Sequence, residues 1–258
     1  MKEVQPVVLL PRSVLVADGQ LYRNISQSPD SIGLLEDLEA MVIPHSGKAE
    51  ANEQEVLSVR ELLSAAGQLI SGTLLIRNPY DAASYEFAEY AIETFAIAKY
   101  HALANVARLL GAREVHFLEA KVDHDIAKWG AVATATVPAG GGEAELSNEV
   151  TKKLEERLES VMKFEGSGPD PEDALAYLRQ RNLSNDQQLR GLVEMRTGTN
   201  PLTEYKMTLS GTRESTANLK SALKIANAGP VKAVDIGGSF SKSAEWISSI
   251  EITTEIKF

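Results

Sequence analysis

The longest periodic segment of the chain, residues 81–110, is the feature that most constrains the fold. Large apolar side chains recur along it every two to four residues and cover most of the circumference of a helix. These residues are Tyr85, Phe87, Tyr90, Ile92, Phe95, Ile97, Tyr100, Leu103, Val106 and Leu110. A helix that is apolar on almost every side is buried in the middle of a fold. We therefore predict a long central helix that ends at Gly111.

Segments with strand patterns flank this helix. The run TLLIR precedes it, and EVHFLEAKV and GAVATATV follow it. The final residues, EWISSIEITTEIKF, alternate apolar and polar side chains with the two-residue period of a half-buried strand. Near the start of the chain, Asp18-Gly19 lies between two apolar runs and predicts a hairpin turn. Together these patterns predict an α+β fold with a mainly antiparallel sheet.

Further helices are expected on both sides of the central one. Ser28-Pro29-Asp30 and Asp170-Pro171 each place a capping side chain before a proline, which is a helix-start signal. The first predicts a helix that reaches about Met41. VKAVDI is expected to be a strand that pairs with the last one. The other predicted helices cover 50–71, 143–164, 170–180, 185–196 and 215–228.

The clearest break in the chain is Pro138 followed by three consecutive glycines. From it we predict an N-terminal α+β unit over 1–139, a helical connecting region over 140–200 and a C-terminal β-α-β-β unit over 201–258. One compact domain is the alternative.

The two tryptophans raise the hypothesis of an internal repeat. Trp129 and Trp246 each follow a polar loop and precede a strand pattern, within 109–137 and 226–256. The chain would then contain two related β-α-β-β units, with the charged helices inserted between them.

Composition excludes several classes of function. The formal charge of −10 disfavours a sequence-independent grip on nucleic acid, which needs a lysine and arginine footprint. The absence of cysteine excludes disulfides, thiolate zinc sites and cysteine nucleophiles. The sequence contains no stretch of about 18 consecutive apolar residues, so we predict no membrane-spanning helix. The apolar N-terminus is interrupted by Pro11-Arg12, so we read no signal peptide there and expect a cytoplasmic protein with no cofactor.

The segment VDHD contains the candidate metal ligands Asp123, His124 and Asp125. Carboxylate and imidazole groups bind divalent cations. Adjacent residues of an extended strand point to opposite sides, however, so these three side chains converge only if the chain turns sharply. A polar loop between two strands is the favoured interpretation.

Two other patterns have ordinary structural explanations beside functional ones. Glu86, Glu89 and Glu93 share a side of the long helix, where a solvated acidic stripe is favoured over a metal centre. The helix pair over 173–196 invites a helix-turn-helix interpretation, with Gln187, Gln188 and Arg190 facing a groove. The acidic balance of the chain favours an ordinary helical hairpin.

The helix expected over 143–164 has a narrow apolar stripe that suits docking on another chain. Its residues are Leu146, Val150, Leu154, Leu158 and Met162. The sequence therefore favours a non-enzymatic binding or assembly protein whose partner is another protein or itself, as a homo-oligomer. Two alternatives stay open. One is a metal-dependent hydrolase using Asp123, His124 and Asp125, and the other is a membrane-active, pore-forming protein with amphipathic strand pairs.

Overall fold

The computed structural model describes residues 10–47, 53–81, 83–123, 142–159, 161–236, 240 and 249–258. The chain forms two compact units that alternate along the sequence, and the expected regions 1–139, 140–200 and 201–258 remain a prediction. The first unit comprises Met1–Asn78, Ala82–Ala91 and Thr216–Ser241. The second comprises Pro79–Asp81, Ile92–Ser215 and Lys242–Phe258.

The first unit contains a four-stranded mixed sheet in the order β2-β1-β3-β4. Strand β1 is parallel to β2 and antiparallel to β3, and β3 is antiparallel to β4. Every residue of β1 and β2 is buried, as expected for strands covered on both faces. The strands are β1 (Ser13–Ala17), β2 (Ala40–Pro44), β3 (Thr73–Arg77) and β4 (Tyr85–Phe87).

Helices cover both faces of this sheet. Val56, Val59 and Leu63 of α2 pack against Val14 and Val16 of β1, on one face. On the other face, the hydroxyl groups of Ser13 and of Ser221 in α7 lie 2.7 Å apart. The helical elements of the unit are α1 (Gly19–Gln27), the short 3-10 helix η1 (Ile32–Leu35), α2 (Glu53–Ala65), α8 (Gly229–Ala233), the start of α3 (Ala88–Leu109) and most of α7 (Arg213–Ala226).

The predicted hairpin at Asp18-Gly19 is wrong. Strand β1 leads directly into α1, and Asp18 caps this helix by accepting hydrogen bonds from the backbone N–H groups of Gln20 and Leu21, at 2.8 and 2.7 Å. Asp is a preferred residue both in turns and at helix starts. The parallel pairing of β1 with β2 requires a crossover rather than a tight turn, and this tertiary requirement decides between the two.

Two further predictions near the termini are also wrong. The helix expected to reach Met41 is confined to η1, and Met41 is buried in β2. VKAVDI is not a strand, because α8 and a turn take its place. The internal repeat needs this segment to match strand β5 (Glu114–Asp123), so the two segments do not share a topology.

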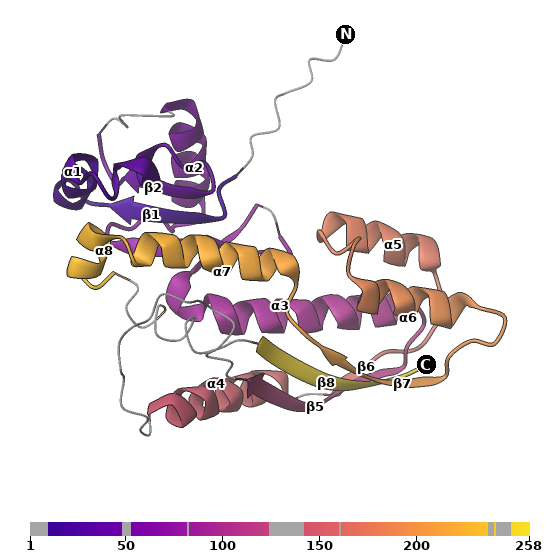
Figure 1. Cartoon of the computed structure of the whole chain (residues 1–258). Helices are drawn as coiled ribbons and strands as arrows, with labels where there is room; N and C mark the ends of the chain where they lie inside the picture. Colours follow the sequence, from indigo (N-terminus) through magenta and orange to yellow (C-terminus); the bar gives the residue numbers. More distant parts are fainter. Residues whose placement is uncertain are drawn as a thin grey trace, which may run out of the picture. The chain divides into compact units, whose positions relative to one another are not determined.

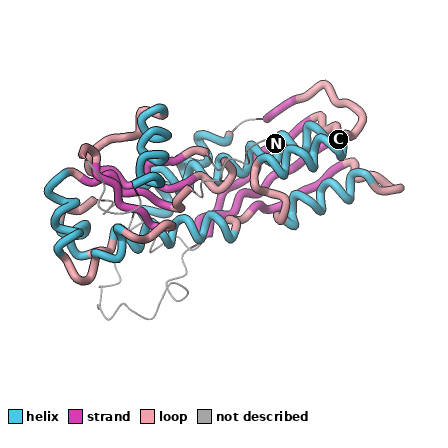
Figure 2. Tube along the Cα trace, turned by 90° about the horizontal axis from the view of Figure 1, so that it is seen from above, coloured by secondary structure: helices cyan, strands magenta, loops and turns pink. Residues whose placement is uncertain are grey.

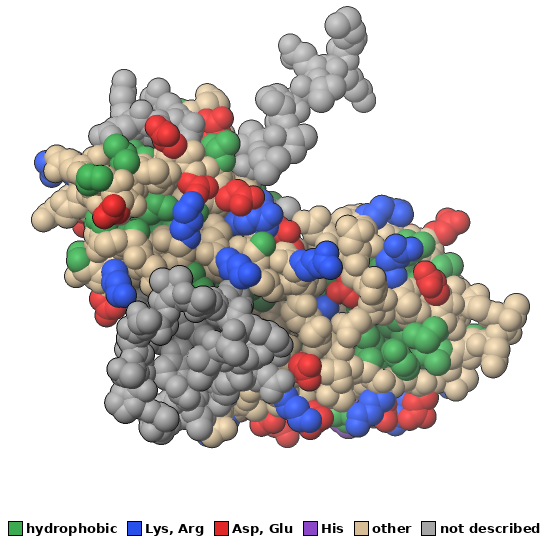
Figure 3. Space-filling model, in the orientation of Figure 1, with side chains coloured by type: hydrophobic (Ala, Val, Ile, Leu, Met, Phe, Trp, Pro, Cys, Tyr) green, Lys and Arg blue, Asp and Glu red, His purple; other side chains and the backbone are tan. Residues whose placement is uncertain are grey.

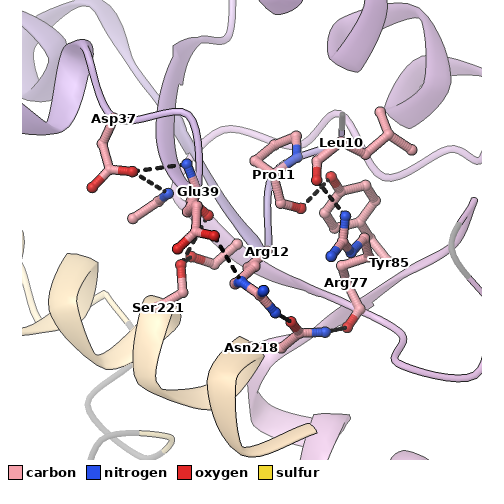
Figure 4. A network of polar contacts seen from close by, with 11 residues as sticks. Leu10, Pro11, Arg12, Asp37, Glu39, Arg77, Tyr85, Asn218 and Ser221 are labelled. Atoms are coloured by element: carbon pink, nitrogen blue, oxygen red, sulfur yellow. Dashed lines mark hydrogen bonds and ion pairs between the residues drawn. The ribbon is translucent and has the colours of Figure 1, made fainter. Parts of the chain in front are cut away.

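Polar contacts hold α7 against the first sheet (Figure 4). The fully buried Asn218 accepts a hydrogen bond from Arg12 Nη1 at 3.0 Å and donates one to the carbonyl oxygen of Arg77 at 2.7 Å. Ser221 donates to the carbonyl oxygen of Glu39 at 2.9 Å. A helix late in the sequence is therefore joined to three segments near the N-terminus.

We expect the Asn218→Ala substitution to lower the free energy of unfolding by about 1–3 kcal/mol, because it removes the two hydrogen bonds that this buried amide makes with Arg12 and with the Arg77 carbonyl group. Asn227→Ala is the matched control, because Asn227 follows α7 and is exposed. The control should change stability by less than about 0.5 kcal/mol. Urea unfolding followed by circular dichroism measures both, and equal losses would contradict the role assigned to Asn218.

Asp37 gives the first unit a defined pH dependence. Burial alone raises the pKa of Asp37, but hydrogen bonds from the Lys224 ammonium and from the backbone N–H groups of Ala40 and Glu39 outweigh it and lower the pKa. A lowered carboxyl pKa stabilises the fold above the unfolded value, near 4, and this contribution is lost as the pH falls through the folded value.

We therefore expect Asp37→Asn to flatten the fall in thermal midpoint between about pH 5 and pH 2 relative to the unsubstituted protein. Glu36→Gln, at the adjacent residue, is the control. Parallel curves for Asp37→Asn and the unsubstituted protein would show that Asp37 does not carry this pH dependence.

The second unit confirms the predicted α+β architecture with a long helix. Its four-stranded sheet has the order β6-β5-β8-β7, and all its pairs are antiparallel. Figure 2 shows the strands of the chain in magenta and its helices in cyan. Helices α3 and α6 lie on one side of this sheet (Figure 1). The strands are β5 (Glu114–Asp123), β6 (Val161–Lys163), β7 (Glu204–Leu209) and β8 (Ser249–Lys257), and the helices are α3 from Ile92 onward, α4 (Gly142–Leu158), α5 (Pro171–Gln180) and α6 (Gln187–Thr197).

The core of the second unit lies between the sheet and α3. Tyr100 of α3 is fully buried and meets Phe117 of β5 edge to face, with ring centroids 6.3 Å apart. Ile252 and Ile256 of β8 are buried as well. Gly111 ends α3 with a positive φ of 84°, as its place after the helix predicts. One face of the sheet therefore packs into the core of the unit.

Candidate interaction surface

The structure does not test whether Asp123, His124 and Asp125 form the polar loop that the sequence favours or the alternative metal site. Asp123 is the last residue of β5, and His124 and Asp125 lie outside the described residues. Within the described part of the chain, no group of three or more His, Cys, Asp or Glu side chains is placed to hold a metal ion. His116 lies earlier than Asp123 in the same strand, β5, on the face of the sheet described below.

The apolar stripe expected to bind a partner is largely covered by the chain itself. Val150, Leu154 and Leu158 of α4 are buried. Met162 lies beyond the helix, in β6, and is half-buried. The side chain of Leu146 is not among those described. Three of the five residues are therefore buried within the chain, and the role of the stripe in binding a partner stays a prediction.

The predicted solvated acidic stripe is wrong for one of its members. Glu93 is buried, and its carboxylate lies 3.8 Å from Lys153 and 4.0 Å from Arg157, both in α4. Glu86 belongs to β4 rather than to the helix. Glu93 therefore helps to position α4 beside α3.

The most deeply buried charges of the second unit are those of Lys99 and Asp186, a pair that sequence patterns did not indicate. The Lys99 ammonium lies 2.7 Å from Asp186 Oδ2, and the side chains are 5% and 6% exposed. Lys99 also donates to the carbonyl oxygen of Ser210 at 2.6 Å. Asp186 caps α6 by accepting from the backbone N–H groups of Gln188 and Leu189, both at 3.1 Å. One ion pair thus connects α3, the start of α6 and the end of β7.

A phenol group lies in the same cluster. Burial raises the pKa of Tyr80, and the negative charge of Asp186 acts in the same direction, while hydrogen bonds with Thr212 and Ser215 oppose it. Tyr80 is therefore neutral at physiological pH. The cluster thus combines a buried ion pair with a neutral phenol, and these groups join several segments of the second unit.

We expect Lys99→Met to lower the free energy of unfolding by about 3–5 kcal/mol, because it leaves a buried carboxylate without its cation. Lys121→Met is the control, since its ion pair with Glu119, at 3.5 Å, is exposed and should be worth less than about 1 kcal/mol. Adding Asp186→Asn to Lys99→Met should recover part of the loss, because Asn still caps α6. Similar losses in the two single variants, measured by urea unfolding, would contradict this assignment.

A shallow polar hollow of about 460 Å³ follows the outer side of α6. It is lined by Asn185, Gln187, Arg190, Gly191 and Glu194. Gln187 and Arg190, two of the residues named in the helix-turn-helix interpretation, line this hollow, and a contact with nucleic acid stays an untested alternative. The third, Gln188, donates its amide to the carbonyl oxygen of Thr208 at 2.6 Å, and so protects the edge strand β7.

The second face of the β6-β5-β8-β7 sheet carries alternating charges. Residues directly opposite one another on antiparallel strands share a face, so the strand register arranges the outward side chains in rows. The first row is Lys163, Glu114, Lys257 and Glu204. The second is Val161, His116, Glu255 and Lys206. Glu119, Thr253 and Thr208 form a third row, and Lys121 and Glu251 a fourth. We call these residues the charged face.

A bulge in β5 keeps the charged face continuous. The register shifts between Phe117 and Glu119, so that Leu118 is an extra residue. Because side chains alternate, one extra residue exchanges inward and outward positions. The bulge therefore keeps Ala120 inside and places Lys121 outside, where Lys121 and Glu251 are opposite each other.

The electrostatics of the charged face centre on Lys257. Hydrogen bonding and charge attraction from Glu255, 3.2 Å away, raise the pKa of Lys257, and the charges of Glu114 and Glu204 act in the same direction. Lys163 lies 3.6 Å from Glu114. Each cation in the first row thus has a carboxylate beside it.

Most of the charged face is partly or fully accessible to solvent in the described part of the chain, whereas Thr253 in its third row is buried. The side chains of Lys163 and Lys257 are 73% and 48% exposed. Acidic and basic side chains and a histidine appear together along the lower edge of the second unit, on the side of the sheet away from α3 (Figure 3). This surface is polar, ordered and open to a partner.

Comparisons with family models, with curated proteins and with solved structures find no match to this chain. None of the helices in the described ranges is long and apolar enough to cross a membrane. A functional proposal therefore depends on the geometry of the described surfaces.

Proposed function

We propose that this protein is a non-enzymatic binding or assembly protein that acts through protein–protein contacts made by the charged face. The observation that carries the proposal is the exposed first row, in which Lys163, Glu114, Lys257 and Glu204 alternate in sign across all four strands. Such a row selects a partner by the positions of its charges rather than by net charge.

The strands give this surface the rigidity that recognition needs. The strand β8 pairs on both sides, with β5 and β7, so its outward side chains start from a fixed backbone. Binding to an ordered surface costs less conformational entropy than binding to a mobile loop. Polar surfaces of this kind suit associations that are specific and reversible.

The ionic groups also set the strength of binding that we expect. Exposed ion pairs contribute little each and are screened by salt. Association through the charged face should therefore be moderate in affinity and should weaken as ionic strength rises.

We expect Lys257→Glu to reduce capture of partner protein at least tenfold, because it places a fourth carboxylate among Glu114, Glu204 and Glu255. The test is affinity capture with the tagged full chain at low salt, scored both for other proteins and for an untagged second copy. Lys152→Glu in α4 is the control, because it makes the same charge change at a residue that is 77% exposed and is not part of the charged face. Capture that is unaffected by Lys257→Glu, or no capture of any protein, would overturn the proposal.

A further inference from the structure

We infer that the occupant of the charged face is a second copy of this chain, bound face to face about a two-fold axis that runs parallel to the strands between β5 and β8. This inference rests on the proposed function and specifies the partner. It follows from the order of signs in the rows, which is complementary to itself under that symmetry operation.

The first row shows the complementarity most fully. A two-fold axis between β5 and β8 exchanges the inner strands, and it exchanges the outer strands β6 and β7. Glu114 then faces Lys257 of the second copy, and Lys163 faces Glu204. Each pair occurs twice, so every charge of this row meets its opposite.

The remaining rows follow the same rule in part, because Glu119 of the third row faces the uncharged Thr253 of the second copy. In the second row, His116 faces Glu255 of the second copy, while Lys206 faces the uncharged Val161. In the fourth row, Lys121 faces Glu251. The bulge at Leu118 is necessary for this match, because without it Lys121 would point into the core.

The dimensions of a sheet pair are compatible with these contacts. Sheets that pack face to face lie about 10 Å apart, a gap that lysine and glutamate side chains extending from both sides can span. Twisted sheets pack at a mean angle of about 30°, which displaces the ends of a 15 Å row by only a few ångströms. Long, flexible side chains can accommodate that displacement.

The area of the charged face predicts a weak dimer. Four strands about 4.8 Å apart and roughly seven residues long give about 350 Å² on each copy. Stable interfaces use about 800 Å² on each partner. The dimer should therefore form at tens to hundreds of micromolar protein and dissociate as salt is added.

The experiment mixes two full-length variants with opposite face charges. Lys163→Glu/Lys257→Glu makes the first row entirely acidic, and Glu114→Lys/Glu204→Lys makes it entirely basic. Sedimentation velocity at about 20 mM salt should show a reversible dimer for the unsubstituted chain and a monomer for each variant alone. An equimolar mixture of the two variants should restore a dimer.

A control variant tests the register rather than the overall charge. Lys206→Glu reverses a charge on the same face, but this residue is opposite Val161 of the second copy. Its dissociation constant should stay within about threefold of the unsubstituted value, whereas Lys257→Glu should raise it at least tenfold. Equal effects of Lys206→Glu and Lys257→Glu would overturn the inferred axis.

Two other results would overturn the inference. One is a monomeric unsubstituted chain at 300 μM and low salt, and the other is a monomeric mixture of folded variants, with folding checked by circular dichroism. If a charge-reversed chain does not fold, the neutral Lys163→Gln/Lys257→Gln variant replaces it, and an undiminished dimer then contradicts the inference. If the chain stays monomeric while Lys257→Glu abolishes capture of a different protein, the inference fails and the proposed function stands.

Discussion

The two-residue period of strand β8 is the constraint on which the second unit depends. Ile252 and Ile256 are buried, so Glu251 and Glu255 must point the other way. Because β8 pairs with β5 and β7 at once, the same alternation extends across the sheet. The alternation of apolar and polar residues thus places the core on one face of the sheet and the charged side chains on the other.

The buried ion pair of Lys99 and Asp186 connects elements that pack around that sheet. It joins α3 to the cap of α6 and to the chain that leaves β7. Gln188, two residues after Asp186, then covers a carbonyl group on the edge of β7. Edge strands readily pair with other chains, and this contact occupies one carbonyl group of that edge.

Local patterns predicted the elements better than they predicted the contacts between them. The continuous apolar pattern of α3 and the alternation of β8 depend on nearby residues, and both elements are confirmed. The start of the helix is not, because Tyr85 and Phe87 form strand β4 and α3 begins at Ala88 rather than at 81. Asp18-Gly19 was misinterpreted because the same residues suit a turn and a helix cap, and only the pairing of β1 with β2 decides. The charged face required the strand order and the bulge at Leu118, which are properties of the whole sheet. Lys99 and Asp186 are far apart in sequence and no local pattern connects them.

The most direct test of the account is the rate at which lysines of the unsubstituted protein are acetylated, residue by residue, in dilute and concentrated solutions at low salt. The account predicts that Lys163, Lys257 and Lys121 react more slowly in the concentrated sample, and that 300 mM salt removes the difference. Lys152, on the outer side of α4, should react equally in both. Rates on the charged face that do not depend on protein concentration, or protection that spares this face and occurs elsewhere, would contradict the account.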